Sequence, residues 1–433
     1  MEITESFILE TTAEYRTLVN GMAIGVVQDG ETRSFFHGWT DSEKLEPIDE
    51  DTQFEIGSLT KPFTSLLLAD LSVDSRLGLD DTVGSFVADC PDHVRGITLR
   101  QLCLHRSGLP RLPSSILNLP EEAYSNPYRD YAVTDLFNDL ADVHLSSKSS
   151  EDYSNFGYGL LGHLLGRKSG SNYLAEIESR VLKPLGMDQT GYRELDNQKG
   201  ATPHEFQDHP VERWEFQDSM VAAGGLRSNL KDMLKFLEAN VIPQSNTQLE
   251  AAIRTSQELQ IEDQNPIKRL FVAGGKGVIL GLASWIVTVT VPVLPGNFWF
   301  ALVTLLPMLV SSWYLGWFGG CMTTAVITSL LWCYPPPGIQ VVQISFDYLI
   351  ICGLIFSVIR FDFFGSENGR SLGWFTRKIS GRTVQWHNGM VGGCASYMAF
   401  EAESQTGVVI LVNTALQPDL VGESLMKAML KGR

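Results

Sequence analysis

The sequence predicts an α+β protein whose chain is interrupted by a block of membrane-spanning helices. Three observations lead to this prediction. Alternating and β-rich apolar runs near both ends of the 433-residue chain are typical of strands. The stretch 80–240 has a mainly helical pattern with many loops. Between residues 271 and 359 the only charged residues are Lys276 and Asp347.

Strands are predicted at both ends of the chain, with turns between them. Residues 21–27 and 33–38 form two strands around the turn Asp29-Gly30. Helices are predicted within the middle stretch over residues 157–165 and 232–241. After the apolar block, strands are predicted over residues 371–375, 383–386, 394–401 and 406–413, with a turn at 403–405 and a closing helix over 416–431.

The apolar block has the run lengths of membrane spans. Residues 277–294, 298–334 and 345–361 are long and almost uncharged, and each is at least about as long as a bilayer span. The middle run is too long for one span, and glycines at 316, 319 and 320 divide it in two. Aromatic residues suit interfacial belts at Trp285, Trp299, Trp313, Trp317, Trp332 and Tyr334. We therefore predict a transmembrane insertion of about four helices over residues 270–363, in preference to a buried helical core.

Composition restricts the class of partner. The net charge of −17 belongs wholly to the chain outside the apolar block, and such acidity argues against nucleic acid, which requires basic patches. The six cysteines contain no C-x-x-C pair and no framework spacing, so we expect no disulfide scaffold and no zinc. No other metal and no cofactor is predicted. The first residues are acidic, and we expect no signal peptide.

A serine and a lysine one helical turn apart suggest nucleophilic chemistry. Ser58 and Lys61 lie in an S-x-x-K pattern at the start of an apolar helix, where residues three apart share a face. A serine hydroxyl needs a neighbouring base, and a lysine in a desolvated pocket can serve as one. Taken alone, the pattern is also that of an ordinary helix start with a surface lysine. Its apolar neighbours favour a buried lysine, which requires a partner or a function.

Further residues complete a candidate site. Tyr153 precedes Asn155 by two residues, and a nearby cation would lower the tyrosine pKa so that it acts as a general base. Without Ser58 and Lys61, an ordinary loop tyrosine would be the better interpretation. His387 opens the run His387-Asn388-Gly389 on a predicted strand, where the glycine allows close approach to the backbone. A glycine turn at 222–228 precedes a helix.

Together these stretches resemble the serine hydrolase family of class C β-lactamases, DD-peptidases and related esterases. The resemblance covers about residues 19–240 and 372–431. The matching stretches are residues 54–64, 97–110, 153–165, 184–187, 222–237 and 386–400. It implies a β-lactamase/penicillin-binding-protein-like fold, an α/β sandwich with a helical subdomain, here interrupted by the membrane block. The two parts of this domain are expected over residues 1–265 and 368–433.

The resemblance also implies roles for the site residues. Ser58 is the nucleophile, Lys61 supports its deprotonation, and Tyr153 relays protons to the leaving group. Asn155 orients the acyl side chain. Substrate binding on the strand falls to His387, Asn388, Gly389 and Met390, with the backbone N–H groups of Ser58 and Met390 as the oxyanion hole. His105, His163 and Cys394 are expected to be structural.

Two departures from the family pattern bear on function. His387-Asn388-Gly389 stands where the family has Lys-Thr-Gly, which removes a permanent cation because histidine is mostly neutral near pH 7. This favours a peptidase or esterase-like substrate over efficient β-lactam hydrolysis. The membrane block is the second departure. Both flanks must join one sheet, which requires an even number of spans, and the basic residues at 268, 269, 276, 360, 370, 377 and 378 place the catalytic domain on the cytoplasmic side.

The sequence therefore predicts a multi-pass membrane serine hydrolase. It would cleave an amide or ester of a small peptide, ester or β-lactam-like substrate through an acyl-Ser58 intermediate. The alternative is a penicillin-binding sensor module that is acylated once and signals through the lipid bilayer. A catalytically silent scaffold is disfavoured by the intact Ser/Lys/Tyr set. The physiological substrate is not readable from the sequence.

Overall fold

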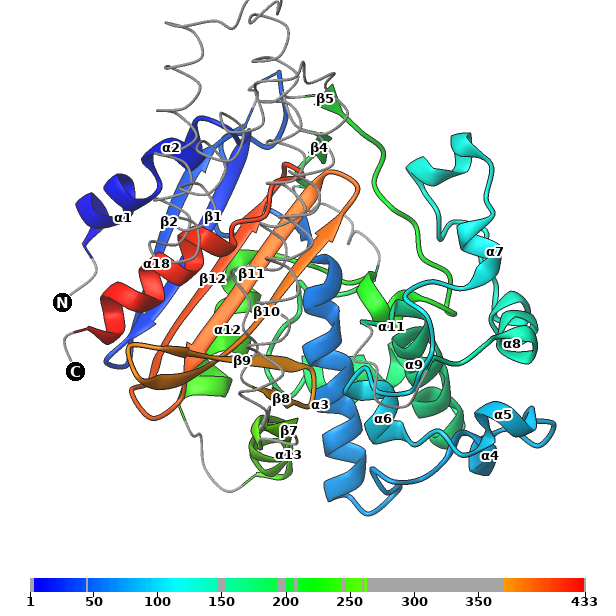
Figure 1. Cartoon of the computed structure of the whole chain (residues 1–433). Helices are drawn as coiled ribbons and strands as arrows, with labels where there is room; N and C mark the ends of the chain where they lie inside the picture. The colour runs from blue at the N-terminus through cyan, green and yellow to red at the C-terminus, as the bar shows by residue number, and fades with distance from the viewer. Residues whose placement is uncertain are drawn as a thin grey trace, which may run out of the picture. The chain divides into compact units, whose positions relative to one another are not determined.

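Strands from both ends of the chain pair in a single antiparallel sheet (Figure 1). In the computed structural model, the residues described are 4–43, 46–146, 153–192, 200–205, 209–242, 247–258, 261–262 and 369–431. They belong to one unit, formed by Met1–Glu262 and Glu367–Arg433. The α+β class predicted from the sequence is confirmed in the described part of the chain.

Within the described residues the main sheet has eight strands in the order β2-β1-β12-β11-β10-β9-β8-β7. Their bounds are β2 (Glu31–Gly38), β1 (Gly21–Gln28), β12 (Thr406–Val412), β11 (Cys394–Glu401), β10 (Arg382–Val391), β9 (Trp374–Ile379), β8 (Gly369–Ser371) and β7 (Ile261–Glu262). The N-terminal hairpin joins the C-terminal strands through β1 and β12, where Met22 faces Val412. Because these strands are far apart in sequence, only the folded chain builds the sheet.

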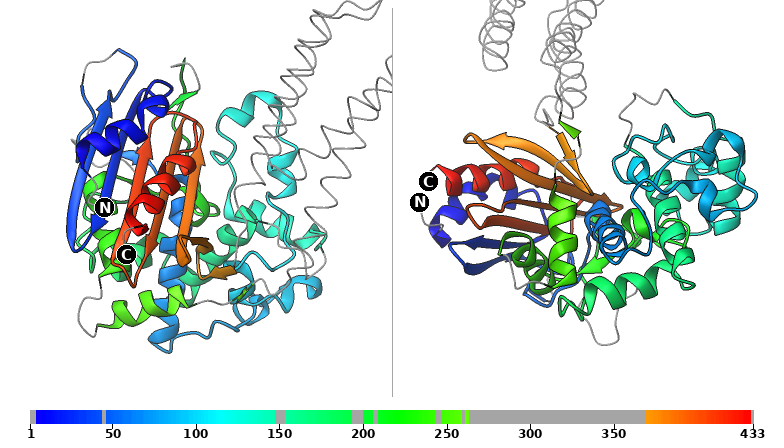
Figure 2. Two further views of the ribbon diagram at one scale, coloured as in Figure 1. Left: turned by 60° about the vertical axis from the view of Figure 1, so that its left-hand side comes forward. Right: turned by 90° about the horizontal axis from the view of Figure 1, so that it is seen from below.

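Helices cover both faces of this sheet (Figure 2). The helix α18 (Asp419–Leu430) lies on β11 and β12, and α1 (Glu5–Thr11) contacts it. On the opposite face α12 (Leu230–Val241) contacts β1, β11 and β12. Alternation along β1 supplies both cores, since Ile24 packs on the α18 face and Ala23 on the α12 face.

Apart from α2, which contacts α1, the remaining helices form a second region beside the sheet (Figure 1). Its buried helices α3 and α9 run side by side, and most of their residues are inaccessible to solvent. The helices are α2 (Ala13–Arg16), α3 (Thr60–Val73), α4 (Val83–Phe86), α5 (Asp92–Arg95), α6 (Leu99–Cys103), α7 (Ser114–Leu117), α8 (Val133–Asp142), α9 (Asn155–Lys168), α10 (Tyr173–Ile177), α11 (Val221–Gly224) and α13 (Gln248–Gln257). Short turns of other helix types are η1 (Gly57–Leu59), η2 (Glu121–Ser125) and η3 (Glu178–Leu182), and the small strand pairs are β3 (Phe54–Glu55) with β6 (Arg227–Ser228) and β4 (His204–Glu205) with β5 (His209–Pro210).

The chain leaves the main sheet and returns to it at neighbouring strands. Ile261 of β7 pairs with Arg370 of β8, and the two strands are antiparallel. The expectation that both flanks of the apolar block build one sheet is therefore confirmed. The predicted transmembrane insertion, residues 270–363, lies outside the described residues. In the part of the chain that the structure describes, no helix has the length and apolar character needed to cross a membrane.

Most predicted elements are observed, with two differences at their ends. The stretch 371–375 is not one strand, because Gly373 adopts φ +77° and turns the chain between β8 and β9. The closing helix begins at Asp419 rather than at residue 416, directly after Pro418. The three cysteines described, Cys90, Cys103 and Cys394, are buried and free.

Candidate active site

Ser58 lies on a tight connection between β3 and α3. The turn requires glycine at the preceding position, since Gly57 has φ +52°. A Cβ atom on Gly57 would also lie 2.8 Å from the backbone nitrogen of Met390 on β10. Ser58 is half-buried at the start of the helical segment, whereas its neighbours on both sides are buried. The local sequence thus exposes one hydroxyl where strand β10 passes.

Lys61 is fully buried and reaches back to Ser58, as the helical spacing predicts. Its Nζ atom lies 3.0 Å from Ser58 Oγ, 2.8 Å from Asn155 Oδ1 and 2.5 Å from the carbonyl oxygen of Ala223. Burial, and then the charge of Arg111, holds the pKa of Lys61 well below its usual range. A neutral amine has two N–H groups, which donate hydrogen bonds to the Asn155 and Ala223 oxygens. Its lone pair is then left for the Ser58 hydroxyl.

Tyr153 lies over the same amine. The Lys61 Nζ atom is 4.8 Å from the centre of the Tyr153 ring, and a hydrogen bond links Tyr153 to Ser58. The expected lowering of the tyrosine pKa is wrong. Burial raises the pKa of Tyr153, and the hydrogen bond to Ser58 and the charge of Arg111 oppose this rise without cancelling it. The resting phenol is therefore protonated and placed to donate.

The His105 ring packs against the Tyr153 ring, which suits the structural role expected for His105. Its ring lies 4.4 Å from that of Tyr153, and its Nδ1 atom accepts a hydrogen bond from the Ser154 backbone at 3.0 Å. Burial, and then the positive charge of Arg370, lowers the pKa of His105 well below its usual value. A neutral ring with its proton on Nε2 satisfies this contact.

Asn155 begins α9, and both the oxygen and the nitrogen of its side-chain amide form hydrogen bonds. Its oxygen accepts from Lys61, and its Nδ2 group donates to the hydroxyl of Tyr128 at 3.3 Å. The preceding Ser154 caps the helix by accepting from Gly157 N at 2.9 Å. The capped helix start therefore fixes Asn155 beside the nucleophile.

Strand β10 approaches Ser58 most closely at Gly389, and only some of its side chains face the site. A Cβ atom on Gly389 would lie 2.9 Å from the backbone nitrogen of Ser58. The predicted oxyanion donors, Ser58 N and Met390 N, thus each lie beside a glycine of the opposing segment. Asn388 is on the other face of the strand, where its Nδ2 group donates to Asp419 Oδ1 at 2.7 Å. The structure does not bring the Asn388 side chain to Ser58.

His387 lies on the site face of β10, but it carries no charge. Its side chain is buried, and its Nδ1–H group donates to the Asn388 carbonyl oxygen at 2.6 Å. Burial and the charges of Lys61 and Arg370 lower the pKa of His387 to about 3. Its ring stacks on Phe375 with centroids 5.1 Å apart. The sequence predicts that this position lacks a permanent cation. At neutral pH His387 is therefore uncharged.

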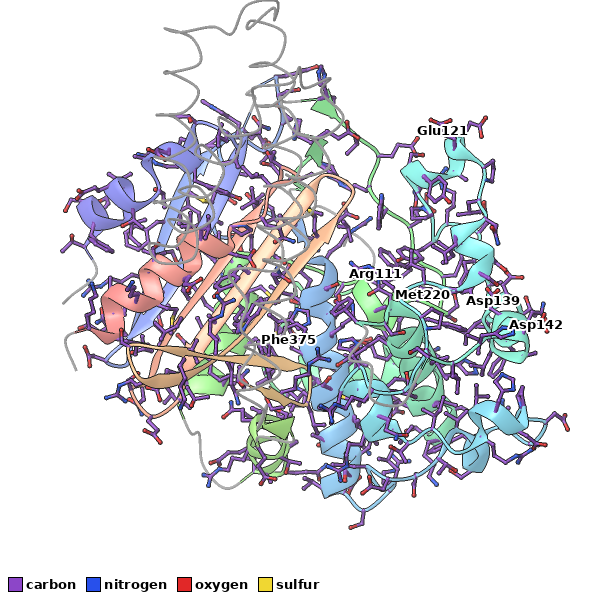
Figure 3. The ribbon with its side chains drawn as sticks, in the orientation of Figure 1. Arg111, Glu121, Asp139, Asp142, Met220 and Phe375 are labelled. Carbon is purple, nitrogen blue, oxygen red and sulfur yellow. The ribbon has the colours of Figure 1, made fainter. Side chains whose placement is uncertain are left out.

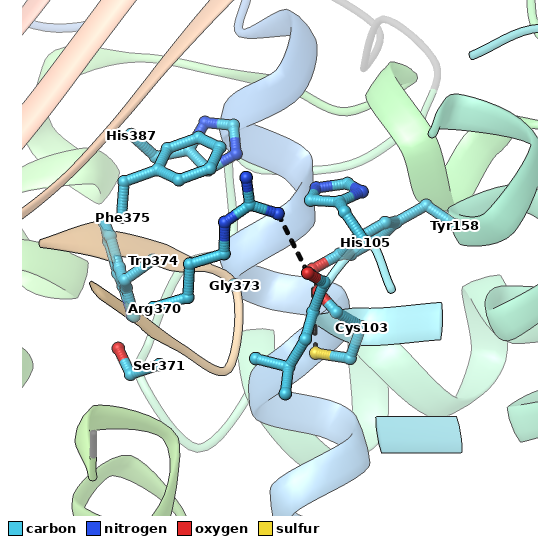
Figure 4. Close-up of a pocket in the computed structure, with 10 residues that line it drawn as sticks. Cys103, His105, Tyr158, Arg370, Ser371, Gly373, Trp374, Phe375 and His387 are labelled. Carbon is cyan, nitrogen blue, oxygen red and sulfur yellow. Dashed lines mark hydrogen bonds between the residues drawn. The ribbon is translucent and has the colours of Figure 1, made fainter. Parts of the chain in front are cut away.

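Two arginines near the site were missed by sequence reasoning. Arg370 lines a small cavity together with His105, Tyr158 and His387, and it donates to the carbonyl oxygen of Leu104 at 2.9 Å (Figure 4). Arg111 lies on the helical side of the site, with its Cζ atom 5.0 Å from the centre of the Tyr153 ring (Figure 3). Neither belongs to a recognisable spacing pattern, because tertiary contacts alone bring them near Tyr153.

Among the described residues, no group of histidine, cysteine and acidic side chains is placed to hold a metal ion. The polar atoms around Ser58 are those of an amine, a phenol, an amide and backbone N–H groups. This set suits nucleophilic attack on a carbonyl carbon.

Comparison with known proteins decides the family. The sequence model described as Beta-lactamase matches residues 10–327 of the chain. The chain belongs to the beta-lactamase family. Its relationship to the serine β-lactamases and penicillin-binding proteins, inferred from the motifs, is thereby confirmed.

Relatives and solved structures agree with this membership. A β-lactamase of Psychrobacter immobilis is 27% identical over 250 residues, which cover 53% of this chain and 55% of that protein. A class C β-lactamase structure matches with a TM-score of 0.67 at 17% identity, covering 100% of this chain and 99% of the other. A β-lactamase/D-alanine carboxypeptidase from Pseudomonas syringae matches with a TM-score of 0.64 at 16% identity, over 98% of each chain. The chain spans about half the length of the curated relatives it matches, and the structural likeness at this identity concerns the fold.

Proposed function

We propose that this protein is a serine hydrolase that cleaves an ester or amide bond through an acyl-Ser58 intermediate. The observation that carries the proposal is the contact of 3.0 Å between Lys61 Nζ and Ser58 Oγ, made by a fully buried amine. Burial favours the neutral amine, which is the form that accepts a proton. A surface lysine would stay charged and could not act in this way.

The reaction follows from these placements. Ser58 Oγ attacks the substrate carbonyl carbon while its proton passes to the Lys61 lone pair. The developing oxyanion accepts hydrogen bonds from the backbone N–H groups of Ser58 and Met390. The Tyr153 phenol donates its proton to the leaving group and regains one from Lys61, which leaves acyl-Ser58 and a neutral amine. Water then attacks the acyl carbon by the same groups in reverse, and the acid product is released.

The neutral His387 favours ester or peptide-like substrates over efficient β-lactam turnover. A β-lactam carboxylate gains most from a permanent cation on this strand, and here the pKa of the buried imidazole is about 3. The structural neighbour named as a β-lactamase/D-alanine carboxypeptidase is consistent with either class of acyl donor. We therefore propose that the substrate is a peptide or an ester.

Labelling of Ser58 tests the proposal. The full chain is treated with a fluorophosphonate probe and with a fluorescent penicillin, and ester hydrolysis is followed with a short-chain nitrophenyl ester. We expect Ser58→Ala to abolish labelling and to lower hydrolysis by about a thousandfold or more. Ser72→Ala, on the same helix and half-buried, is the control and should behave as the wild type. Equal labelling of both variants would disprove an acyl-Ser58 intermediate.

Turnover separates an enzyme from the sensor alternative. An enzyme releases the acyl group repeatedly, so product exceeds one equivalent of protein. A sensor module that is acylated once gives a single burst and a stable adduct. The buried amine of Lys61 beside Ser58 can accept and return a proton in each cycle, and we therefore favour the enzyme.

We further propose that residues 270–363 anchor the protein in a membrane through about four helices. The near absence of charge from residue 271 to residue 359 supports this, as does the pairing of β7 with β8 on either side of the block. Strands that are neighbours in one sheet require both ends of the insertion to lie on the same side of the bilayer. Extraction with alkaline carbonate tests anchoring, because an integral protein stays with the membrane.

The proposed orientation is with the catalytic unit toward the cytoplasm. Two of the basic residues counted for this orientation, Arg370 and Arg377, are buried in the sheet, where Arg377 pairs with Glu423 at 2.7 Å. The proposed orientation therefore rests on the other five basic residues, Lys268, Arg269, Lys276, Arg360 and Lys378. Protease treatment of sealed vesicles of known orientation tests it. Digestion of the catalytic unit from the outer face of intact cells would contradict it.

A further inference from the structure

We propose that Arg111 binds an anionic group carried by the acyl part of the substrate, so that the protein prefers acyl donors with a second, negatively charged end. This inference rests on the proposed acyl-Ser58 chemistry and adds a substrate class to it. It places the recognised charge on the side of Asn155. The family's Lys-Thr-Gly position, here His387, would place it on strand β10 instead.

The backbone of Arg111 is fastened to the residues that flank the nucleophile. Asn155 N donates to the carbonyl oxygen of Arg111 at 2.9 Å, and the Ser154 hydroxyl donates to the carbonyl oxygen of Pro110 at 2.7 Å. The segment with Arg111 therefore cannot move independently of the start of α9. Because Asn155 is the residue expected to contact the acyl side chain, Arg111 is anchored on the acyl side.

The guanidinium of Arg111 is available to a ligand. The Arg111 side chain is exposed, and its Cζ atom lies 5.0 Å from the centre of the Tyr153 ring. Among the residues that the structure describes, no carboxylate lies within ion-pair distance of Arg111, although other exposed arginines such as Arg129 pair with acidic side chains. An exposed arginine held beside a nucleophile suits a carboxylate of a ligand, which it can bind through two N–H groups.

Charge around the nucleophile is positive. Burial raises the pKa of Tyr153 and Tyr128 and lowers that of Lys61, and the charge of Arg111 favours a lower pKa at all three groups; among the described residues no acidic side chain acts on them. From the described side chains, an anionic group that enters the site therefore meets the attraction of Arg111 and no repelling carboxylate. The effect is strongest near Arg111, since that side chain acts on all three groups.

The other cations near the site are already committed. Arg370 is only 7% exposed, donates to the Leu104 carbonyl oxygen and lies over the ring of Phe375. Lys61 is fully buried behind Ser58 and bonded to three oxygen atoms. His387 is neutral. Arg111 is therefore the cation near Ser58, among the described residues, that combines exposure with a fixed position.

A matched pair of esters isolates the acyl side. The full chain is assayed with two esters of adipic acid: the 4-nitrophenyl monoester, whose far end is a free carboxylate, and the mixed diester, in which that carboxylate is a methyl ester. The two share the nitrophenol leaving group and differ in one negative charge. A second pair places the charge on the leaving group: 3-carboxyphenyl acetate and its methyl ester. The variants are Arg111→Gln, Arg111→Lys and the control Arg33→Gln, whose arginine pairs with Glu31 on the edge strand β2.

We expect the wild type to favour the adipate monoester in kcat/KM by about tenfold to a hundredfold, as for a hydrogen-bonded charge pair. Arg111→Gln should remove this preference and leave the neutral diester unchanged, Arg111→Lys should retain part of it, and Arg33→Gln should retain all of it. The preference should shrink as salt is raised from about 0.01 M to about 1 M. The second ester pair should not respond to Arg111→Gln.

Three results would overturn the proposal, and they are distinguishable. No preference between the adipate esters, with Ser58-dependent turnover of both, would refute the role of Arg111 and leave the hydrolase standing. An equal loss on both esters in Arg111→Gln, with a shifted pH profile, would show that Arg111 acts through Tyr153 instead. No turnover and no labelling of Ser58 would refute the hydrolase itself, and the anion preference with it.

Discussion

A Cβ atom on Gly389 would lie 2.9 Å from the backbone nitrogen of Ser58, so strand β10 and the nucleophile turn meet backbone to backbone. The same hypothetical atom would lie 2.1 Å from the carbonyl oxygen of Ile56. In the same way, a Cβ atom on Gly57 would lie 2.8 Å from the backbone nitrogen of Met390. Two glycines from distant parts of the chain therefore let the two proposed oxyanion donors approach each other.

Gly389→Ala should slow acylation and also lower stability, because the added methyl group overlaps the Ile56 carbonyl oxygen. The added methyl group pushes β10 from Ser58 and displaces the Met390 N–H group, and loss of one oxyanion donor costs about 10²–10³ in rate. The measurement is the rate of Ser58 acylation, with thermal unfolding alongside. Gly96→Ala is the control, because a Cβ atom there meets nothing within 4 Å. An unchanged acylation rate in Gly389→Ala would exclude Met390 N as a donor.

Lys61→Arg should abolish acylation although it keeps a basic side chain. A guanidinium does not lose its proton, so it cannot accept one from Ser58, and removal of a general base costs about 10²–10⁴ in rate. In the wild type the rate should rise with pH through the Lys61 pKa, which burial holds well below its usual range. The pH profile of acylation measures this. A wild-type profile that rises only near the usual lysine pKa would contradict a neutral amine at neutral pH.

Asn388→Ala should destabilise the protein and spare the chemistry. The substitution leaves the half-buried Asp419 without its hydrogen bond from Asn388, and the buried Oδ2 atom of Asp419 already lacks a partner in the described structure. The loss of such a bond costs about 1–3 kcal/mol in the free energy of unfolding. Chemical denaturation measures the change, with Asn118→Ala as an exposed control whose amide donates to Ser114 O. A large fall in kcat/KM with unchanged stability would instead support the substrate-binding role expected from the sequence.

Glu55→Gln should reduce the dependence of stability on pH. Burial raises the pKa of Glu55 from 4.5 to about 7, and the charges of Arg227 and Arg213 and the bond from Trp214 N only partly oppose this. A raised acid pKa means that the folded state holds the proton more tightly, so its contribution is full below about pH 4.5 and is lost as pH rises through about 7. The shift corresponds to about 3 kcal/mol.

The free energy of unfolding, measured at several pH values from acid to mildly alkaline, checks this expectation. Glutamine keeps the acceptor for Trp214 N, which lies 3.0 Å from Glu55 Oε1, and it cannot ionise. The variant should therefore gain stability relative to the wild type as pH rises. A constant difference between the two proteins over the whole range would show that Glu55 does not titrate in this window.

Much of the site was readable from local spacing. Ser58 and Lys61 are three residues apart on a helix, and this geometry alone brings their side chains together. Apolar neighbours predicted that Lys61 is buried, and its exposure of 0% agrees. The strands β1, β2, β11 and β12 and the helices α9 and α12 follow from periodicity for the same reason, since side-chain repeats depend on nearby residues.

Other properties depend on neighbours that are remote in the chain. The pKa of Tyr153 is raised and not lowered, because burial by the assembled fold outweighs the cations around it. Alternation places Asn388 opposite His387, but only the packing of α18 gives its amide a partner. Arg111 carries no motif, and Tyr153 lies near its guanidinium through tertiary contacts. Residue identity and spacing therefore specified which chemical groups this protein uses, whereas their charge, orientation and partners arise from burial and long-range contacts that no local pattern encodes.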